Sequence, residues 1–322
     1  MKKVSVIMPA YNGEKFIGEA IQSIIDQTYQ NWELIVIDDC SKDGTLDVIR
    51  QFDDQRIVLY QNDENKGIAF GTNLGIEKST GDYIALLDDD DVAMKDRFKI
   101  QVDYLDSHPE IDVLGGADIE IDENGDYIKC SGPPLRNPKL IKAYLLFFKN
   151  MFTDCTVMYR KDFVQKNNIR YAEGCFGMHD VKFYMDASKK GNIKGIDEIL
   201  IKKRIYEGQE TQIQRKTNWK KRAEKYAELQ CESIHNSGFK LSKKQLGTIC
   251  RMVPERFCDT YSLHELNDLY NVFKEILNQA DEMAIDYKKE LRYALTKILF
   301  DRVALKMDVF STNFYLGGKN DG

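Results

Sequence analysis

The chain has 322 residues, of which 43% are hydrophobic and 30% are charged, so it can bury a sizeable core and keep a soluble surface. No segment reaches the roughly 18 apolar residues of a membrane-spanning helix. The first residues run directly into an apolar strand pattern, without the apolar block of a signal peptide. We therefore expect a cytoplasmic protein.

The cysteines, histidines and glycines exclude several classes of site. Seven cysteines occur without a CxxC pair, and the four histidines do not form HExxH, so neither a disulfide framework nor a zinc site is indicated. Neither GxGxxG nor GxxxxGK[ST] occurs. Dinucleotide binding and P-loop nucleotide hydrolysis therefore lack their main sequence support.

Strands and helices alternate along residues 4–87. Continuous apolar runs predict the strands, and apolar residues at helical spacing predict the helices. The predicted strands are Val4–Met8, Leu34–Ile37, Ile57–Tyr60 and Tyr83–Leu87, and the predicted helices are Phe16–Gln27, Leu46–Phe52 and Ile68–Lys78. This order predicts an α/β fold with a mostly parallel sheet and helices on both faces.

A different pattern follows residue 115. Residues Asp118–Cys130 predict a hairpin with its turn at Glu123-Asn124-Gly125. Short strands are predicted at Thr156–Tyr159 and Ile193–Gly195, and helices at Phe163–Asn167 and Val181–Lys189. We expect one domain over residues 1–213, made of a first part (1–115) and a second part (116–213).

Strand signals nearly vanish after residue 213. Helices are predicted at Asn218–His235, Ser242–Met252, Leu263–Gln279 and Ala284–Phe310. The region 214–322 holds 19 Lys and Arg against 15 Asp and Glu, whereas residues 1–213 hold 27 against 37. The acidic first region argues against a nucleic-acid partner, and the contrast predicts different roles for the two regions.

The last predicted helix has apolar residues at helical spacing, among them Leu291, Leu295 and Ile298, so one face must be buried. Three alternatives remain open: packing within the chain, a dimer interface, and contact with an anionic membrane. Glu290 and Asp301 weaken attraction to anionic lipid. Self-association is therefore favoured over membrane contact.

Four consecutive aspartates, Asp88 to Asp91, follow the predicted strand Tyr83–Leu87. Like charges this close repel one another, and carboxylate oxygens are ligands that Mg²⁺ and Mn²⁺ prefer. Ligands of open α/β sheets bind beyond the carboxyl ends of the strands. The run therefore predicts a divalent-cation site, with an exposed acidic turn as the alternative.

Other short motifs lie on loops of the same predicted sheet edge. They are Pro9-Ala10-Tyr11-Asn12-Gly13-Glu14, Asp38-Asp39-Cys40-Ser41-Lys42-Asp43-Gly44-Thr45, Asn65-Lys66-Gly67 and Asn73-Leu74-Gly75-Ile76. In this order, and followed by Leu87-Asp88-Asp89-Asp90-Asp91, they resemble family 2 glycosyltransferases with the GT-A fold, a Rossmann-like architecture. The resemblance covers roughly residues 3–210 and leaves the C-terminal helical region outside.

The resemblance implies that residues 1–115 bind a nucleotide sugar and that 116–213 bind an acceptor. The implied nucleotide-sugar-binding residues are Pro9, Ala10, Tyr11, Asn12, Glu14, Asp39, Gly67, Asn73, Asp88 and Asp89. The ring of Tyr11 can stack on a base, and Asp39 can accept the imide N–H of uracil. The plainer alternatives are strand-end packing for Tyr11 and capping of the turn and helix for Asp39.

The resemblance also assigns a DxD metal motif within the aspartate run. It implies a Mn²⁺ or Mg²⁺ cofactor, with Asp90 as the main ligand and Asp88 as a second ligand. Asp88 or Asp89 would then face the ribose, and the register is ambiguous by one residue. The cation would stabilise the departing nucleoside diphosphate as a Lewis acid.

A transfer that inverts the anomeric carbon needs a general base for the acceptor hydroxyl. The resemblance places this base at a helix start, where Gly177-Met178-His179-Asp180-Val181-Lys182-Phe183-Tyr184 matches. Asp180 is the base candidate, with helix capping as its alternative. His179 stands where many relatives have Glu, and it is a second base, an acceptor contact or a plain helix-start residue.

Besides His179, the chain departs from the family pattern in two further places. Thr72 stands where relatives often have Arg, and Tyr206 stands where relatives often have His. We expect the stretch Lys203–Thr211 to be a mobile lid over the donor. No Gln-x-x-Arg-Trp motif occurs, so a processive polysaccharide synthase is not expected.

The sequence leads to one main hypothesis and one alternative. The main hypothesis is an inverting glycosyltransferase that moves a hexose from a UDP-sugar to a hydroxyl of a glycan, glycoprotein or lipid-linked acceptor, with Asp180 as base. The alternative is a non-catalytic nucleotide-sugar-binding or scaffold protein of the same fold. Expected partners are the donor, the acceptor, and a second copy through the C-terminal helices, with peripheral contact at the inner face of the membrane as the other option.

Overall fold

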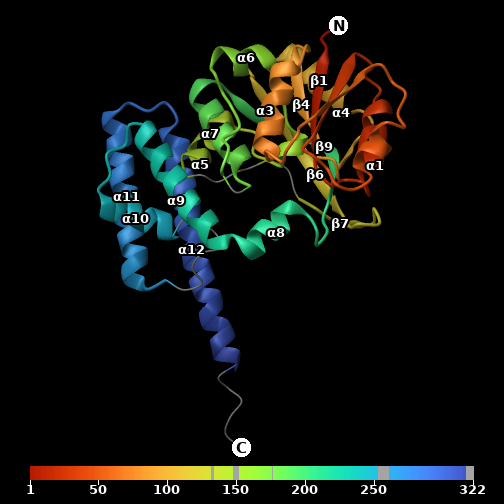
Figure 1. Cartoon of the computed structure of the whole chain (residues 1–322). Coiled ribbons are helices and arrows are strands. Elements are labelled where there is room, and N and C mark those ends of the chain that lie inside the picture. Colours follow the sequence, from red (N-terminus) through yellow and green to blue (C-terminus); the bar gives the residue numbers. More distant parts are fainter. Residues whose placement is uncertain (132–133, 148–151, 176, 253–260, 317–322) are drawn as a thin grey trace, which may run out of the picture. The chain divides into compact units, whose positions relative to one another are not determined.

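The structure is a computed structural model that describes residues 1–131, 134–147, 152–175, 177–252 and 261–316 (Figure 1). Of residues 214–216 and 305–316 it describes the backbone only. The chain divides into two compact units. The first contains Met1–Ile141 and Asn150–Trp219, and the second contains Lys142–Lys149 and Lys220–Gly322.

One sheet of nine strands forms the centre of the first unit as far as the structure describes it. The strands are β1 (Val4–Ala10), β2 (Trp32–Asp38), β3 (Ile57–Gln61), β4 (Tyr83–Leu86), β5 (Val92–Ala93), β6 (Val113–Ile121), β7 (Tyr127–Cys130), β8 (Met158–Arg160) and β9 (Ile193–Arg204). Their order is β3-β2-β1-β4-β8-β6-β9-β5, with β7 beside β6. Strands β3, β2, β1 and β4 are parallel to their neighbours in this series, and β8 runs antiparallel to β4.

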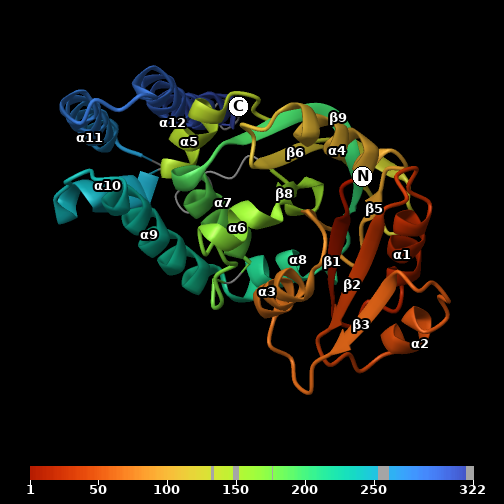
Figure 2. The same cartoon turned by 90° about the horizontal axis from the view of Figure 1, so that it is seen from above.

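Helices cover both faces of this sheet. Figure 2 shows α1 (Ile17–Ile25) and α2 (Thr45–Ile49) on one face, with α3 (Ile68–Lys78) and α6 (Lys161–Lys166) on the other. The other helices of the unit are α4 (Arg97–Ser107), α7 (His179–Lys190), α8 (Glu210–Thr217) and the first residues of α5 (Pro138–Leu146). The predicted α/β fold, with a mostly parallel sheet flanked by helices, is confirmed.

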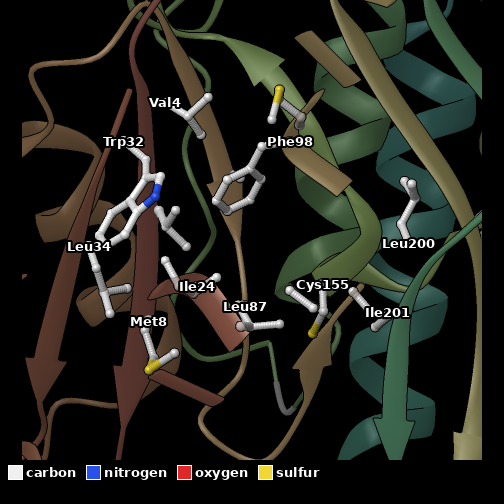
Figure 3. Packing of buried hydrophobic residues seen from close by; sticks show 14 of the residues in the cluster. Val4, Met8, Ile24, Trp32, Leu34, Leu87, Phe98, Cys155, Leu200 and Ile201 are labelled. Carbon is white, nitrogen blue, oxygen red and sulfur yellow. The ribbon is translucent and has the colours of Figure 1, made fainter. Parts of the chain in front are cut away.

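The main apolar core lies between the sheet and the helices α1 and α4. Figure 3 shows Val4 and Met8 of β1 and Trp32 of β2 near Ile24 of α1 and Phe98 of α4, all buried. Strands β1 and β2 are buried along most of their length, because helices cover both sheet faces, and such strands read as continuous apolar runs. This rigid centre fixes the loops that follow each strand.

Several elements differ from their predicted extent. Strand β9 runs from Ile193 to Arg204, far beyond the predicted Ile193–Gly195. Charged residues interrupt its apolar pattern, but pairing with β6 and β5 keeps the backbone extended. Helix α5 and the two-residue strand β5 were not predicted, and α8 begins inside the stretch expected to be a lid.

The second unit is helical. Its elements are the end of α5, most of α9 (Trp219–Asn236), α10 (Lys243–Met252), α11 (Leu263–Glu282) and α12 (Lys288–Leu316). Helix α11 begins with a capping box, in which the Ser262 side chain accepts from the backbone N–H of Glu265 and the Glu265 side chain accepts in return. No helix in the described ranges is both long enough and apolar enough to cross a lipid bilayer.

The apolar face of α12 is buried by the chain itself. Leu291, Ala294, Leu295 and Ile298 are at most 3% exposed, and α11 packs against α12. Of the three alternatives for this face, packing within the chain therefore holds for these four residues. Leu305, another member of the predicted face, lies among the side chains that are not described.

Candidate functional site

The carboxyl ends of β1, β2 and β4 lie at one edge of the sheet, because Ala10 pairs with Asp38 and Ile7 pairs with Leu86. Strand β8 runs in the opposite direction, with Met158 paired to Ala85 of β4. Its beginning therefore lies at the edge where β4 ends. This arrangement brings the loops after β1, β2 and β4 together with the short helical turn η1 (Asp154–Thr156) that precedes β8.

The loops after β1 and β2 are tied together by hydrogen bonds. The backbone N–H of Asn12 donates to the Ser41 hydroxyl at 3.0 Å, and the Asn12 side chain accepts from the backbone N–H of Lys42 at 2.8 Å. The carboxylate of Glu14 accepts from the backbone N–H of Gly44 at 2.9 Å. Asn12 and Glu14, both predicted to bind the donor, therefore shape the loop that presents the other residues.

Tyr11 is an exposed aromatic residue of these loops. Its side chain is 49% exposed, while its backbone N–H donates to Asp89 at 3.2 Å. Pro9 and Ala10 belong to β1, where the carbonyl oxygen of Ala10 accepts from the backbone N–H of Asp39 at 2.8 Å. The Tyr11 ring is thus available for stacking beside the aspartate run.

Asp39 has the local role that was the alternative to base recognition. Its buried carboxylate accepts from Asn62 at 2.8 Å and from the backbone N–H groups of Lys66 at 2.9 Å and Gly67 at 2.7 Å. Gly67 precedes α3 with a φ of +85°, a conformation that favours glycine. A carboxylate has about four acceptor positions, and the N–H of Lys66 is shared between both oxygens, at 2.9 and 3.1 Å, so these bonds already occupy the carboxylate.

Asn73 of α3 is engaged within the fold. Its amide donates to the carbonyl oxygen of Tyr171 at 2.8 Å and accepts from the backbone N–H of Tyr171 at 3.0 Å. Thr72, which stands where relatives often have Arg, donates its hydroxyl to the carbonyl oxygen of Ile68 at 2.8 Å. This helix therefore anchors the segment before α7 through Asn73.

The four aspartates after β4 point toward different partners. Asp88 accepts from the Cys155 thiol at 2.8 Å, and Asp89 accepts from Tyr11. Asp90 is approached by the Gln209 amide at 3.5 Å and accepts a hydrogen bond from Tyr206. Asp91 accepts from the backbone N–H of Arg204 at 2.8 Å, and its second oxygen is buried without a hydrogen-bond partner among the described residues.

Burial and mutual repulsion make this run electrostatically costly. Burial, and then the negative charges of Asp90 and Asp88, raise the pKa values of Asp89 and Asp91 well above their usual range. Burial and the charge of Asp88 raise the pKa of Asp90 to about 7. A divalent cation would favour the charged forms and relieve the repulsion.

The residues present fit such a cation. Ligand atoms of Asp88, Asp91 and Cys155 lie within 4.8 Å of one another, and the unpartnered oxygen belongs to Asp91. Carboxylate oxygens suit Mg²⁺ and Mn²⁺. The structure thus groups Asp88 with Asp91, whereas the sequence predicted Asp88 with Asp90, and Asp88 is common to both sets.

Arg204 forms hydrogen bonds with the aspartate run. Its guanidinium is almost fully buried and donates to the carbonyl oxygens of Asp90 at 3.0 Å and Asp122 at 3.2 Å, and it pairs with Glu19 at 2.5 Å. The guanidinium also lies 4.4 Å from the centre of the Phe16 ring. The sequence named Arg204 only as part of the lid, since nothing in the pattern showed that it is buried.

The base candidate lies at the start of α7. The helix begins at His179, and its N-cap position is Met178, without a side-chain capping bond. Asp180 therefore lies in the first turn of the helix, and Met178 occupies the N-cap position. The His179 ring lies 5.9 Å from the ring of Tyr171, centre to centre.

Asp154 is a site residue that the sequence analysis missed. Its carboxylate accepts from the hydroxyl of Tyr184, one turn after Asp180 in α7, and from that of Tyr171 at 3.3 Å. Burial, then the charge of Asp180, raise the pKa of Asp154 well above its usual range, and Asp88 adds to the effect. The charges of Asp180 and Asp88 thus both act on the carboxyl group of Asp154.

One signal in the sequence could have found Asp154. If a strand runs antiparallel to β4, the residue just before it lies at the edge where β4 ends. The residues Thr153-Asp154-Cys155 precede the predicted strand Thr156–Tyr159, but the direction of that strand cannot be read from its composition. Knowing the direction would have placed Asp154 beside the aspartate run.

A cavity of about 500 Å³ lies elsewhere in the first unit. It is lined by residues that include Lys2, Asp82 and Arg160. Lys2 precedes β1, Asp82 precedes β4 and Arg160 ends β8, so this cavity is at the opposite edge of the sheet. It therefore takes no part in the site described above.

The sequence matches the family described as Glycosyl transferase family 2 over residues 5–167. An uncharacterized glycosyltransferase of Haemophilus influenzae is 32% identical over 219 residues, which cover 65% of this chain and 68% of that protein. EpsE of Bacillus subtilis, whose name is that of a glycosyltransferase, is 44% identical over 126 residues, or 38% of this chain and 45% of EpsE. The chain belongs to glycosyltransferase family 2.

Solved structures show the same fold. TarS of S. aureus, residues 1–349 in complex with UDP-GlcNAc, superposes with a TM-score of 0.62 at 20% identity and covers 96% of this chain and 92% of the TarS chain. The mannosyltransferase PcManGT of Pyrobaculum calidifontis, in complex with GDP-Man and Mn²⁺, gives a TM-score of 0.56 at 15% identity and covers 95% of this chain and 87% of PcManGT. The aligned parts of this chain span less than half the length of the first curated relatives that it matches.

Proposed function

We propose that this chain is an inverting glycosyltransferase that moves a hexose from a nucleotide sugar to a hydroxyl of a glycan, glycoprotein or lipid-linked acceptor. One observation carries the proposal. Asp154 precedes Cys155, whose thiol donates to Asp88, and its carboxylate accepts from Tyr184 of α7, the helix that carries Asp180. A base candidate and a site for the leaving diphosphate thus share one sheet edge.

The donor is proposed to be a UDP-sugar, bound at the loops after β1 and β2. The exposed ring of Tyr11 is suited to stacking on a base, and an imide N–H at Asp39 would replace one of the bonds that this carboxylate accepts within the fold. TarS was solved with UDP-GlcNAc and PcManGT with GDP-Man, so structures of this fold hold nucleotides with either base. Uracil is proposed as the base because a carboxylate such as that of Asp39 can accept the imide N–H of uracil.

The chemistry proposed is a single displacement. Asp180 accepts the proton of the acceptor hydroxyl as its oxygen attacks the anomeric carbon, opposite the departing diphosphate. Asp154 fixes the first turns of α7 through Tyr184 and so positions Asp180. Asp88 and Asp90 would hold Mn²⁺ or Mg²⁺, which supplies Lewis-acid stabilisation of the diphosphate when bound.

The segment between β9 and α8 is proposed to close over the donor. Tyr206 and Gln209 of this segment contact Asp90, and the Tyr206 ring packs on Phe16 with 5.1 Å between centres. These contacts hold the segment against the aspartate run. A donor phosphate that competes for Asp90 would change them, as expected of a lid.

A panel of nucleotide sugars tests the proposal. Each of UDP-glucose, UDP-galactose, UDP-GlcNAc and GDP-mannose is incubated with the chain and Mn²⁺, and release of the nucleoside diphosphate is measured. We expect release from a UDP-sugar that is lost in excess chelator. Tight binding of a donor without release, even with added glycan acceptors, would instead support the non-catalytic alternative.

A further inference from the structure

Two thiols of the second unit lie next to one another. The Sγ atom of Cys231 in α9 is 3.2 Å from the Sγ atom of Cys250 in α10. Both residues are half-buried, so small reagents can reach them. Neither belongs to the first unit, where the candidate site lies.

The surrounding residues hold the two helices in this register. Ile234 of α9 and Ile249 and Met252 of α10 are buried, and the Gln230 side chain donates to the carbonyl oxygen of Phe147 at 3.0 Å. A disulfide has an S–S distance of about 2.05 Å, so the two sulfurs need to approach by only about 1 Å. Side-chain rotation at two half-buried positions can supply such a movement.

The two thiols are not equivalent. Burial, and then the hydrogen bond to Cys231, raise the pKa of Cys250 to about 12. The Cys250 thiol also lies 3.5 Å from the carbonyl oxygen of Ala227, which accepts from it. The Cys250 thiol is thus engaged by the carbonyl group of Ala227, and the first attack on an oxidant is assigned to Cys231.

We propose that Cys231 and Cys250 form a reversible oxidation site, in which a peroxide converts the thiol pair into a disulfide that links α9 to α10. The Cys231 sulfur attacks one peroxide oxygen, and the O–O bond breaks to give a sulfenic acid and water. The Cys250 thiol then attacks the Cys231 sulfur while its proton passes to the sulfenic oxygen, so that the S–S bond forms and the S–O bond breaks with loss of a second water. Two thiols are oxidised by two electrons and one hydrogen peroxide is reduced to two water molecules.

Peptide mapping of the full chain tests this site. The folded chain is treated with hydrogen peroxide, remaining thiols are alkylated, and the unreduced protein is cut with trypsin. Cleavage after Lys225, Lys240, Lys244 and Arg251 gives the peptides 226–240 and 245–251, each with one of the two cysteines. We expect these peptides to be joined, with a mass 2 Da below their sum, and to separate on reduction.

Two controls make the result specific. Cys130, an exposed cysteine of the first unit, offers the variant Cys130→Ser, which should form the link as the unmodified chain does. In urea the fold no longer holds the two sulfurs together. The ratio of the Cys231–Cys250 link to links between other cysteines should therefore be at least tenfold lower than in the folded chain. The proposal is overturned if both peptides carry alkylated cysteines after oxidation of the folded chain, or if the unfolded chain forms the link as selectively.

Discussion

The side-chain amide of Asn73 forms two hydrogen bonds with the backbone of Tyr171, at 2.8 and 3.0 Å. These two hydrogen bonds attach helix α3 to the segment that leads into α7. The Tyr171 ring in turn stacks on Phe183 of α7, with 4.4 Å between ring centres. Helix α3 is therefore connected to α7 through the segment that contains Tyr171.

Asn73→Ala should therefore weaken the fold. Two partly buried hydrogen bonds are lost, and we expect the free energy of unfolding to fall by about 2 kcal/mol. Urea unfolding of the full chain measures the change. Gln51→Ala, which alters an exposed amide after α2, is the matched control and should stay within about 0.5 kcal/mol of the unmodified chain. If Asn73→Ala is as stable as the unmodified chain, the two hydrogen bonds do not stabilise the fold, and donor binding becomes the favoured role of Asn73.

Asp180→Asn tests the proposed base. The amide cannot accept the acceptor proton, so we expect transfer to fall by about 10²–10⁴-fold while donor affinity stays within a few-fold. Transfer is followed by release of the nucleoside diphosphate, and affinity by calorimetry. Near-normal transfer by this variant would place the base elsewhere, with His179→Ala as the next variant to measure.

Asp154→Asn tests the positioning of that base. We expect a fall in kcat of about 10–100-fold, because loss of the carboxylate loosens the first turns of α7 and small misplacements of a reacting group are costly. The KM for the donor should change little, since Tyr11 and Asp39 are untouched. Asp162→Asn, at an exposed pair with Lys166, is the control and should leave kcat unchanged. Equal kcat values for the two variants would count against the role of Asp154.

Binding measurements can distinguish the two alternative sets of metal ligands, Asp88 with Asp90 and Asp88 with Asp91. Electron paramagnetic resonance of Mn²⁺ reports affinity without any acceptor, and we expect Asp88→Asn to lose about tenfold or more in affinity because Asp88 belongs to both ligand sets. The proposed pair predicts a similar loss for Asp90→Asn and a smaller loss for Asp91→Asn. The reverse order would move the second ligand to Asp91, the residue that the structure groups with Cys155.

Glu33 provides a pH-dependent contribution to stability. Burial alone would raise its pKa, but hydrogen bonds from Lys3, Ser5 and Thr80 outweigh burial and lower the pKa to about 2, from 4.5. The stabilisation is therefore fully present above pH 4.5 and is lost as the pH falls toward 2. Glu33→Gln should cost about 2 kcal/mol at pH 7, after allowance for solvent screening, and less at pH 3.

Thermal unfolding between pH 3 and 7 measures this effect. The difference in Tm between the unmodified chain and Glu33→Gln should shrink as the pH is lowered. Glu77→Gln, at an exposed position of α3, is the control and should show little difference at any pH. A Tm difference that stays constant down to pH 3 would contradict the lowered pKa of Glu33.

The sequence predicts the elements of residues 4–87 well because strands β1, β2 and β4 are buried. Apolar runs and helical spacing place β1 to β4 and α1 to α3 within a few residues, and α3 matches its predicted bounds of Ile68–Lys78. Strand β9 is predicted poorly because its charged residues are held extended by neighbouring strands. Pairing across the sheet is a tertiary effect that local patterns do not contain.

The sequence identifies candidate residues of the site, but it does not predict which groups their side chains contact. The aspartate run and Asp180 are visible as motifs, whereas Asp154 depends on the direction of β8, which only the assembled sheet determines. Asn12, Glu14 and Asn73 are predicted to bind the donor, whereas in the structure their side chains form hydrogen bonds with backbone groups of the protein. Spacing in a sequence cannot distinguish a residue that contacts a ligand from one that shapes the loop around it.

The buried guanidinium of Arg204 makes position 204 sensitive to substitution. Its donors are shared among backbone carbonyl groups and a carboxylate, a geometry that the single ammonium of lysine cannot reproduce. A permanent positive charge is thus built into the protein directly behind its most negative loop. In a screen for inactive variants, position 204 should be hit as often as the aspartates themselves, although a ligand at the surface would never touch it.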